Sequence, residues 1–139
     1  MAVDSGRTKA MNQSIRTFRD LEVYKSAFKF QQQVFELSKN WPKEETYALT
    51  GQIRRSTRAV GANIAEAWAK RRYEAHFVSK LTDADGELQE SLHWISSAEA
   101  CAYITEETAQ SLILGLESIG RQLGAMISKS ALFCPIPKG

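Results

Sequence analysis

Hydrophobic residues recur along this chain at intervals of three and four, the spacing that gathers them on one side of an α-helix. The pattern predicts four helices, near residues 20–40, 45–70, 73–102 and 105–129. The first segment carries two adjacent apolar stripes, and each of the others carries one. The stripes of the two central segments are Leu49, Ile53, Val60, Ile64 and Ala67, and Phe77, Leu81, Ala84, Leu88, Leu92, Ile95 and Ala98.

The breaks between these segments are short. Asp20 is expected to cap the first helix, Pro42 to end it, and Thr105 to cap the fourth. Residues 69–74 contain neither proline nor glycine, so the chain either turns or kinks there. Short connections place consecutive helices antiparallel and side by side. The sequence therefore predicts an all-α, single-domain, up-down-up-down four-helix bundle.

A chain of 139 residues suits one domain. We expect the bundle to span residues 18–129, with residues 1–17 and 130–139 as flexible tails. No apolar run approaches the roughly 20 residues that cross a bilayer, and the N-terminal segment lacks the apolar stretch of a secretory signal. Cys101 and Cys134 have no further ligands nearby, which favours free thiols. These features predict a cytoplasmic protein outside the membrane.

Charge is distributed unevenly, although the whole chain carries only +2. Residues 51–80 contain seven basic and two acidic side chains, a net charge of +5. Residues 81–120 contain eight acidic side chains and neither Lys nor Arg, a net charge of −8. The basic second helix can therefore pair with the acidic third helix or face an anionic partner.

Few residues are placed for catalysis or metal binding. His76 and His93 lie on one predicted helix about 25 Å apart, so one subunit cannot bring them together. The carboxylates at positions 83, 85, 87 and 90 lack the Glu-x-x-His repeats of dinuclear metal bundles, and we interpret them as a solvated or salt-bridged face. No nucleophile, zinc or nucleotide-binding motif occurs. We expect no enzyme activity, no cofactor and no metal.

The second predicted helix presents a basic face with small residues between its arginines. Arg54, Arg58 and Arg72 fall within about 40° of one another at 100° per residue. The small residues on this face are Gly61, Ala62, Ala65 and Ala69, and further positive charge comes from Arg55, Lys70 and Arg71. Small residues on a polar face allow another backbone or a bulky partner to approach closely.

Two interpretations of this face remain open from the residues alone. In the first, the arginines pair with the acidic third helix and serve solubility or subunit contacts. In the second they bind phosphates, because the planar guanidinium group makes bidentate hydrogen bonds and released counterions supply affinity. The residues that would contact nucleic acid are Arg54, Arg55, Arg58, Lys70, Arg71 and Arg72.

Three segments resemble a bacterial family of four-helix bundle proteins, named for proteins encoded in intervening sequences of 23S ribosomal RNA genes. They are residues 18–24 (FRDLEVY), 49–56 (LTGQIRRS) and 63–66 (NIAE). The accessory variability determinant of diversity-generating retroelements is a relative of that family. The resemblance covers about residues 18–129, and its most specific part is residues 49–68.

The resemblance implies a four-helix bundle that assembles into a homopentamer and interacts with RNA or DNA. Arg58 falls at a position that the family does not fix, whereas the other five basic residues match its basic segment. Asn63 and Glu66 match a polar pair, which we interpret as an interhelical or intersubunit contact. Two departures stand out, because Ala67 replaces the usual glycine and residues 85–87 (DGE) add negative charge.

The sequence thus predicts a non-enzymatic homo-oligomer that binds RNA or DNA through the basic face. Reversal of charge at Arg54 and Arg58 is expected to abolish RNA binding and leave helicity intact. The alternative is an interaction module, such as an accessory subunit of a reverse transcriptase, that uses the same face for a protein partner.

Overall fold

The computed structural model describes residues 15–135, which form four α-helices and three short 3-10 helices. The α-helices are α2 (Glu22–Ser38), α3 (Leu49–Ala69), α4 (Glu74–Ala100) and α5 (Glu106–Ser128). The 3-10 helices are η1 (Phe18–Asp20), η2 (Lys43–Glu45) and η3 (Ser130–Leu132). No helix in this range is long and apolar enough to cross a membrane.

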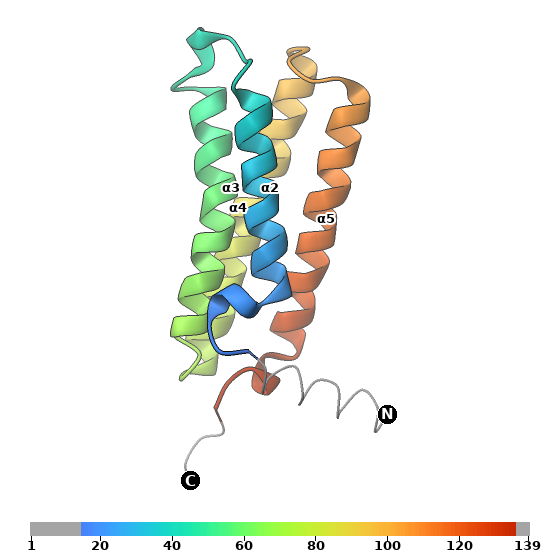
Figure 1. Ribbon diagram of the computed structural model, residues 1–139. Helices are drawn as coiled ribbons and strands as arrows, with labels where there is room; N and C mark the ends of the chain where they lie inside the picture. Colours follow the sequence, from blue (N-terminus) through green and yellow to red (C-terminus); the bar gives the residue numbers. More distant parts are fainter. Residues whose placement is uncertain (1–14, 136–139) are drawn as a thin grey trace.

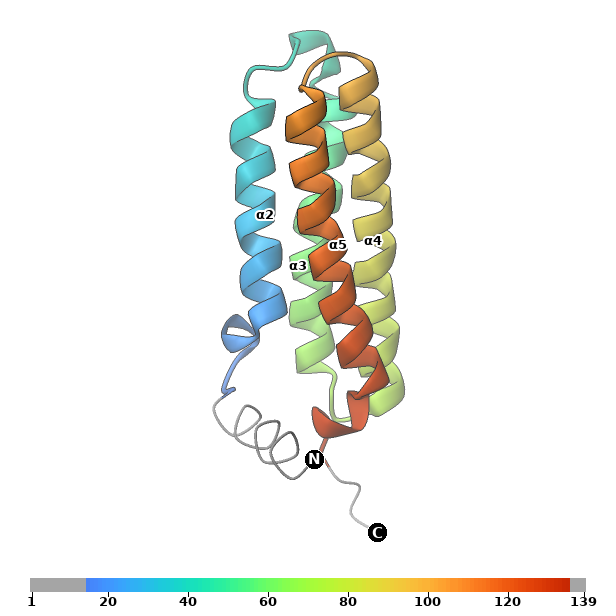
Figure 2. The same cartoon turned by 90° about the vertical axis from the view of Figure 1, so that its right-hand side faces the viewer.

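Consecutive helices run in opposite directions, and their connections alternate between the two ends of the molecule (Figure 1). Figure 2 shows α5 between α2 and α4, with α3 behind it. Side-chain contacts agree with this order. Arg54, early in α3, bonds to Ser38 at the end of α2, and Glu66, late in α3, pairs with Lys80 early in α4. The predicted antiparallel four-helix bundle is confirmed for the described residues.

The core consists of the predicted apolar stripes. In α2 the stripe of Val23, Ala27, Phe30 and Val34 is buried, whereas Phe28 of the adjacent stripe is 47% exposed. Each fully buried aliphatic side chain contributes about 1.5–3 kcal/mol relative to an exposed one, so these stripes decide which faces meet. The largest fully buried hydrophobic side chains are Val34, Ile53, Ile64, Phe77, Leu81, Leu88, Ile95, Leu116 and Leu123.

The start of the bundle differs from the prediction. Asp20 does not cap the long first helix. Its carboxylate accepts hydrogen bonds from the backbone N–H groups of Arg16 and Thr17, 2.9 and 3.1 Å away, and completes a capping box around η1. α2 begins after Leu21, which is buried and has no side-chain capping bond. The pattern resembled a helix start because the capping box places an acid where an N-cap is also favoured.

The second helix also begins later than predicted. The chain first forms η2 and then turns, so that α3 starts at Leu49 and not near Glu45. The Glu45 carboxylate accepts hydrogen bonds from the backbone N–H of Leu49 at 3.4 Å and from the Tyr103 hydroxyl at 2.8 Å. Glu45 therefore joins the α2–α3 connection to the α4–α5 connection at the same end of the bundle. Thr105 caps α5 as predicted, since its hydroxyl accepts from the Thr108 N–H at 3.1 Å.

The structure describes only part of the two predicted tails. Residues 1–14 and 136–139 lie outside the described residues. Part of the predicted C-terminal tail packs on the bundle, because the buried Ser130 donates to the Glu74 carboxylate and the Phe133 ring stacks on Phe77. The folded part of the chain therefore extends beyond Lys129. The Phe133 ring and the Ser130 hydroxyl attach this extension to α4.

Candidate nucleic-acid interface

The first group of basic residues surrounds the ring of Phe35 on α2, at the seam with α3. We call Phe35, Ser38, Lys39, Arg54 and Arg58 the Phe35 cluster. The guanidinium carbons of Arg54 and Arg58 lie 4.7 and 5.6 Å from the ring centroid, and the Lys39 ammonium lies 4.9 Å from it. Cations are attracted to the negative face of an aromatic ring at such distances. One half-buried phenylalanine therefore gathers three positive charges from two helices.

Arg54 is held in a fixed position within this cluster. Its Nε donates to the Ser38 hydroxyl at 2.8 Å, and one terminal nitrogen approaches the Phe35 carbonyl at 3.5 Å. Arg54 is half-buried and Arg58 is exposed. Neither arginine forms an ion pair with a carboxylate within residues 15–135, whereas Lys39 pairs with Glu36 at 3.1 Å. The cluster therefore keeps two uncompensated guanidinium groups at the surface.

Arg55 faces the other way, toward α4. Its guanidinium pairs with Glu87 at 3.1 Å and with Glu90, whose carboxylate also accepts from the Trp94 indole nitrogen at 3.1 Å. The hydrogen bond from Trp94 and the ion pair with Arg55 lower the pKa of Glu90, and the bond to Glu90 and the charge of Glu87 raise the pKa of Arg55. The first interpretation, pairing with the acidic helix, therefore holds for Arg55.

The remaining basic residues of the predicted set lie beyond α3. The helix ends at Ala69, so Lys70, Arg71 and Arg72 belong to the α3–α4 turn and not to the helical face shared with Arg54. The prediction that Arg72 continues this face is wrong, and the open choice at residues 69–74 resolves as a turn. Arg71 lies over the Trp68 ring, 3.9 Å from its centroid, and donates to the Trp68 carbonyl at 2.7 Å. Arg71 therefore contacts the last turn of α3 and does not extend its basic face.

The small and polar residues of α3 divide into separate roles. Gly61 is buried against α2, and an added methyl group would lie 3.5 Å from the Tyr24 ring, so this glycine is an interhelical contact. Glu66 pairs with Lys80 of α4 at 3.1 Å, which raises the pKa of Lys80, and is likewise interhelical. Asn63 instead donates to the Ala59 carbonyl of its own helix at 2.9 Å.

The alanines of the small-residue stripe are less enclosed. Ala62 and Ala69 are exposed and Ala65 is half-buried. Their predicted role in subunit contact stays a prediction, as does the pentamer.

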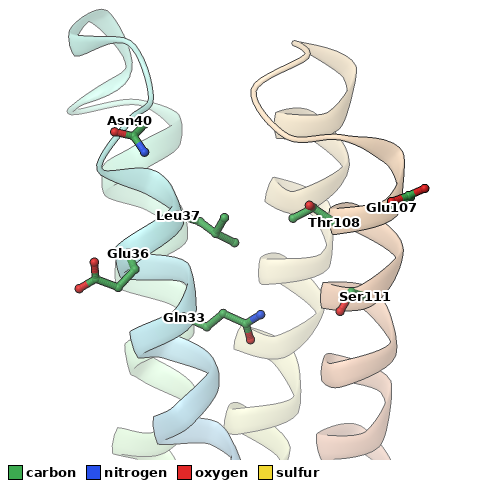
Figure 3. Close-up of a pocket in the computed structure, with 7 residues that line it drawn as sticks. All are labelled: Gln33, Glu36, Leu37, Asn40, Glu107, Thr108 and Ser111. Carbon is green, nitrogen blue, oxygen red and sulfur yellow. The ribbon is translucent and has the colours of Figure 1, made fainter.

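A shallow groove lies on the opposite side of α2, between this helix and α5. It has a volume of about 700 Å³ and is lined by Gln33, Glu36, Leu37, Asn40, Glu107, Thr108 and Ser111. Figure 3 shows Gln33 and Leu37 directed toward α5, whereas Glu36 and Glu107 point outward. The lining of this groove contains neither Lys nor Arg. The basic cluster and the groove therefore occupy different seams of α2.

The residues considered for chemistry are dispersed. His76 lies in the first turn of α4 and His93 lies 17 residues further along it, and Asp83 pairs with Lys80 at 3.6 Å. Within residues 15–135 no group of three or more His, Cys, Asp or Glu side chains is placed to hold a metal ion. Cys101 is exposed and Cys134 is half-buried, and both are free thiols.

Sequence reasoning missed the contribution of α2 to the basic face. In the sequence Phe35 belongs to one of the two apolar stripes of the first predicted helix, and neither Ser38 nor Lys39 stands out. The helical spacing of residues 35, 38 and 39 does place them on one side of α2. That spacing alone does not reveal that this side faces Arg54, because the pairing depends on the rotation of two helices about their axes.

Taken together, the described chain is a helical bundle with a cationic and aromatic cluster on one interhelical seam. It belongs to the 23S rRNA-intervening sequence protein family, whose model matches residues 19–125. The resemblance seen in residues 18–66 is therefore confirmed. A search of curated proteins gave no match.

A solved structure shows the same relationship. It is a protein of unknown function from the S23 ribosomal protein family of Bacteroides thetaiotaomicron. The two sequences are 29% identical, and the superposition has a TM-score of 0.70 and covers 76% of this chain and 95% of that chain. The likeness therefore extends over most of both chains.

Proposed function

We propose that this protein is a non-enzymatic RNA-binding protein that contacts the phosphate backbone through the Phe35 cluster. The observation that carries the proposal is the contrast between neighbouring arginines. Arg55 is neutralised by two carboxylates of α4, whereas Arg54 and Arg58 share an aromatic ring and pair with no carboxylate in the described chain. An anion supplied by a partner would complete this cluster.

The geometry suits phosphate for a physical reason. Arg54 is already fixed by Ser38 and Phe35, so less side-chain entropy is lost when it binds. Arg58 is exposed and adds a second guanidinium beside it. Two such groups make charge-assisted hydrogen bonds to phosphate oxygens, and each neutralised phosphate releases counterions. The solved neighbour's name, which assigns that protein to the S23 ribosomal protein family, supports RNA as the nucleic acid.

The test is RNA binding measured by fluorescence anisotropy with a labelled RNA. The informative variant combines Arg54→Gln with Arg58→Glu. Because Arg54 is half-buried, glutamine is chosen there to keep a hydrogen-bonding group beside Ser38. We expect its affinity to fall at least about tenfold and its dependence on salt concentration to weaken, since fewer counterions are released. Circular dichroism should show unchanged helicity.

A matched control combines Arg121→Glu with Lys129→Gln. Both residues are exposed near the end of α5, and this variant removes one charge and reverses another, as the test variant does. If the control and the test variant weaken binding equally, affinity reflects net charge alone and the Phe35 cluster is not the site.

The alternative is that this side of α3 binds another protein or another copy of the chain. The exposed Ala62 and Ala69 favour it, because small side chains allow a partner helix to approach closely. In that case Ala62→Arg should change the mass of the protein in solution, and the Arg54 and Arg58 changes should alter assembly without a separate effect on RNA. Mass measurement and RNA binding on the same samples distinguish the two functions.

The non-enzymatic part of the proposal rests on the dispersal of the reactive side chains. Glu87 and Glu90 are engaged with Arg55, and the two histidines lie 17 residues apart on α4. Stoichiometric iron or manganese in the purified protein would contradict it.

A further inference from the structure

The α3–α4 turn carries an exposed aromatic ring among basic side chains. Residues 70–72 are Lys, Arg and Arg, and Tyr73 follows them directly before α4. The turn lies at the end of the bundle away from the α2–α3 connection (Figure 1). Tyr73 is 58% exposed, although tyrosine in a folded protein usually buries much of its ring.

Two neighbours hold the Tyr73 ring in place. The guanidinium carbon of Arg72 lies 5.7 Å from the ring centroid, and the His76 imidazole makes an edge contact with a centroid distance of 5.4 Å. The ring is therefore flanked by two nitrogen-rich side chains while more than half of the residue stays accessible. This arrangement differs from that of Tyr47, which is 93% exposed and has no aromatic or cationic contact within the described chain.

Contacts with the two neighbouring elements hold the turn. The Arg71 guanidinium packs on the Trp68 ring and donates a hydrogen bond to the Trp68 carbonyl, so it is engaged within the protein. The adjacent acid, Glu74, accepts a hydrogen bond from Ser130 of η3. Arg72 makes no ion pair with Glu74, and its positive charge remains next to the Tyr73 ring.

We propose that Tyr73, flanked by Arg72 and His76, is a stacking site for an unpaired nucleobase of a single-stranded RNA segment. Exposed aromatic rings bind bases of any sequence through their π faces, and nearby arginines add cation–π attraction and phosphate contacts. A base within a duplex is already stacked on both sides and cannot use the ring. The proposal rests on the proposed RNA-binding function and specifies its ligand as a single strand.

The experiment compares a labelled single strand of about 12 nucleotides with a duplex of the same sequence, a length within the range that single-strand-binding folds cover. Tyr73→Ala should weaken binding of the single strand on the order of tenfold and leave duplex binding unchanged. Tyr73→Trp should restore the single-strand affinity, because it restores a stacking surface. Tyr47→Ala is the matched control and should change neither affinity.

An abasic strand separates stacking from a purely structural role. Removal of one base at a time should find a position at which wild-type protein and Tyr73→Ala bind equally well. Equal losses on single strand and duplex, or equal effects of Tyr73→Ala and Tyr47→Ala, would overturn the stacking site.

The two proposals fail in different ways. If Tyr73→Ala has no effect while the Arg54 and Arg58 changes weaken binding, only the stacking site is wrong. If Tyr73→Ala weakens binding while the Arg54 and Arg58 changes have no effect, the stacking site is supported and the Phe35 cluster is not the phosphate site. If the wild-type protein binds neither the single strand nor the duplex, both proposals are wrong.

Discussion

The guanidinium carbon of Arg54 on α3 lies 4.7 Å from the centre of the Phe35 ring on α2, while the Nε of the same arginine donates to Ser38 one turn further along α2. The Phe35 ring and the Ser38 hydroxyl, both on α2, thus hold the Arg54 guanidinium at two points. The adjacent Arg55 has neither contact and bonds to α4. The position of a basic residue around the helix, and not its charge alone, decides whether it is available to an anion.

Replacement of the ring tests this relationship. Phe35→Leu keeps an apolar side chain but removes the aromatic face, and each cation–π contact contributes about 0.5–1 kcal/mol at an exposed site. We therefore expect RNA affinity to fall about two- to fivefold with little loss of stability. Binding equal to that of the wild type, with the Arg54 and Arg58 changes still harmful, would show that the ring does not position the arginines.

Two glycines provide opposite predictions for stability. A methyl group on Gly51 would lie 2.7 Å from the Thr46 carbonyl oxygen, and because this oxygen belongs to the backbone, the start of α3 would have to move. At the same position on Gly124 in α5, no atom of residues 15–135 lies within 4 Å apart from the chain neighbours and the backbone of its own helix. Gly51→Ala should therefore destabilise the protein, and Gly124→Ala should stabilise it by about 0.5–1 kcal/mol. Urea denaturation measures both, and stabilisation by Gly51→Ala would contradict the packing described at this turn.

Tyr103 should titrate at unusually high pH. Its hydroxyl donates to the Glu45 carboxylate, and this bond raises the pKa of Tyr103 to about 12. A raised folded-state pKa means that the bond stabilises the fold below the ordinary tyrosine value of 10.0 and that this stabilisation is lost as pH rises toward about 12. Tyrosinate absorbance should show one late-titrating group.

Glu45→Gln is the control for that titration. It removes the carboxylate charge but leaves a hydrogen-bond acceptor, so the late group should move to lower pH. A titration curve that Glu45→Gln does not change would assign the late group to another tyrosine.

Acid should weaken the contact between α3 and α4 at Glu90. The hydrogen bond from Trp94 and the ion pair with Arg55 hold the pKa of Glu90 below its ordinary value of 4.5. A lowered folded-state pKa contributes stability above pH 4.5 that disappears as pH falls through the folded value. Because the pair is partly exposed, the contribution is small.

Tryptophan emission should contain this change, since protonation of Glu90 alters the acceptor of the Trp94 indole N–H. Glu90→Gln should remove the acid-dependent step in the emission, and it should also reduce the loss of stability between neutral and acid pH. An identical step in Glu90→Gln would show that Glu90 is not the titrating group.

The sequence predicts which helices of the site are basic and acidic, but not which side chains pair with one another. The basic second helix and the acidic third helix were evident from the sequence, and pairing between them occurs at Arg55 and at Glu66. The same pattern could not show that Arg54 forms no ion pair with α4, since Arg54 and Arg55 are adjacent in the sequence. Arg72 was misplaced because the prediction continued α3 past Ala69.

The sequence by itself determined the four helices, their antiparallel order and most of the positions that form the core. Periodic apolar residues encode these features locally, and short connections leave few ways to assemble them. Only the tertiary structure decided which neighbour each α3 side chain meets. Residues one position apart are turned by about 100° around a helix, so Arg54 reaches Phe35 of α2 while Arg55 reaches the carboxylates of α4. That choice depends on how each helix is rotated against its neighbours, and core packing sets this rotation across the whole bundle.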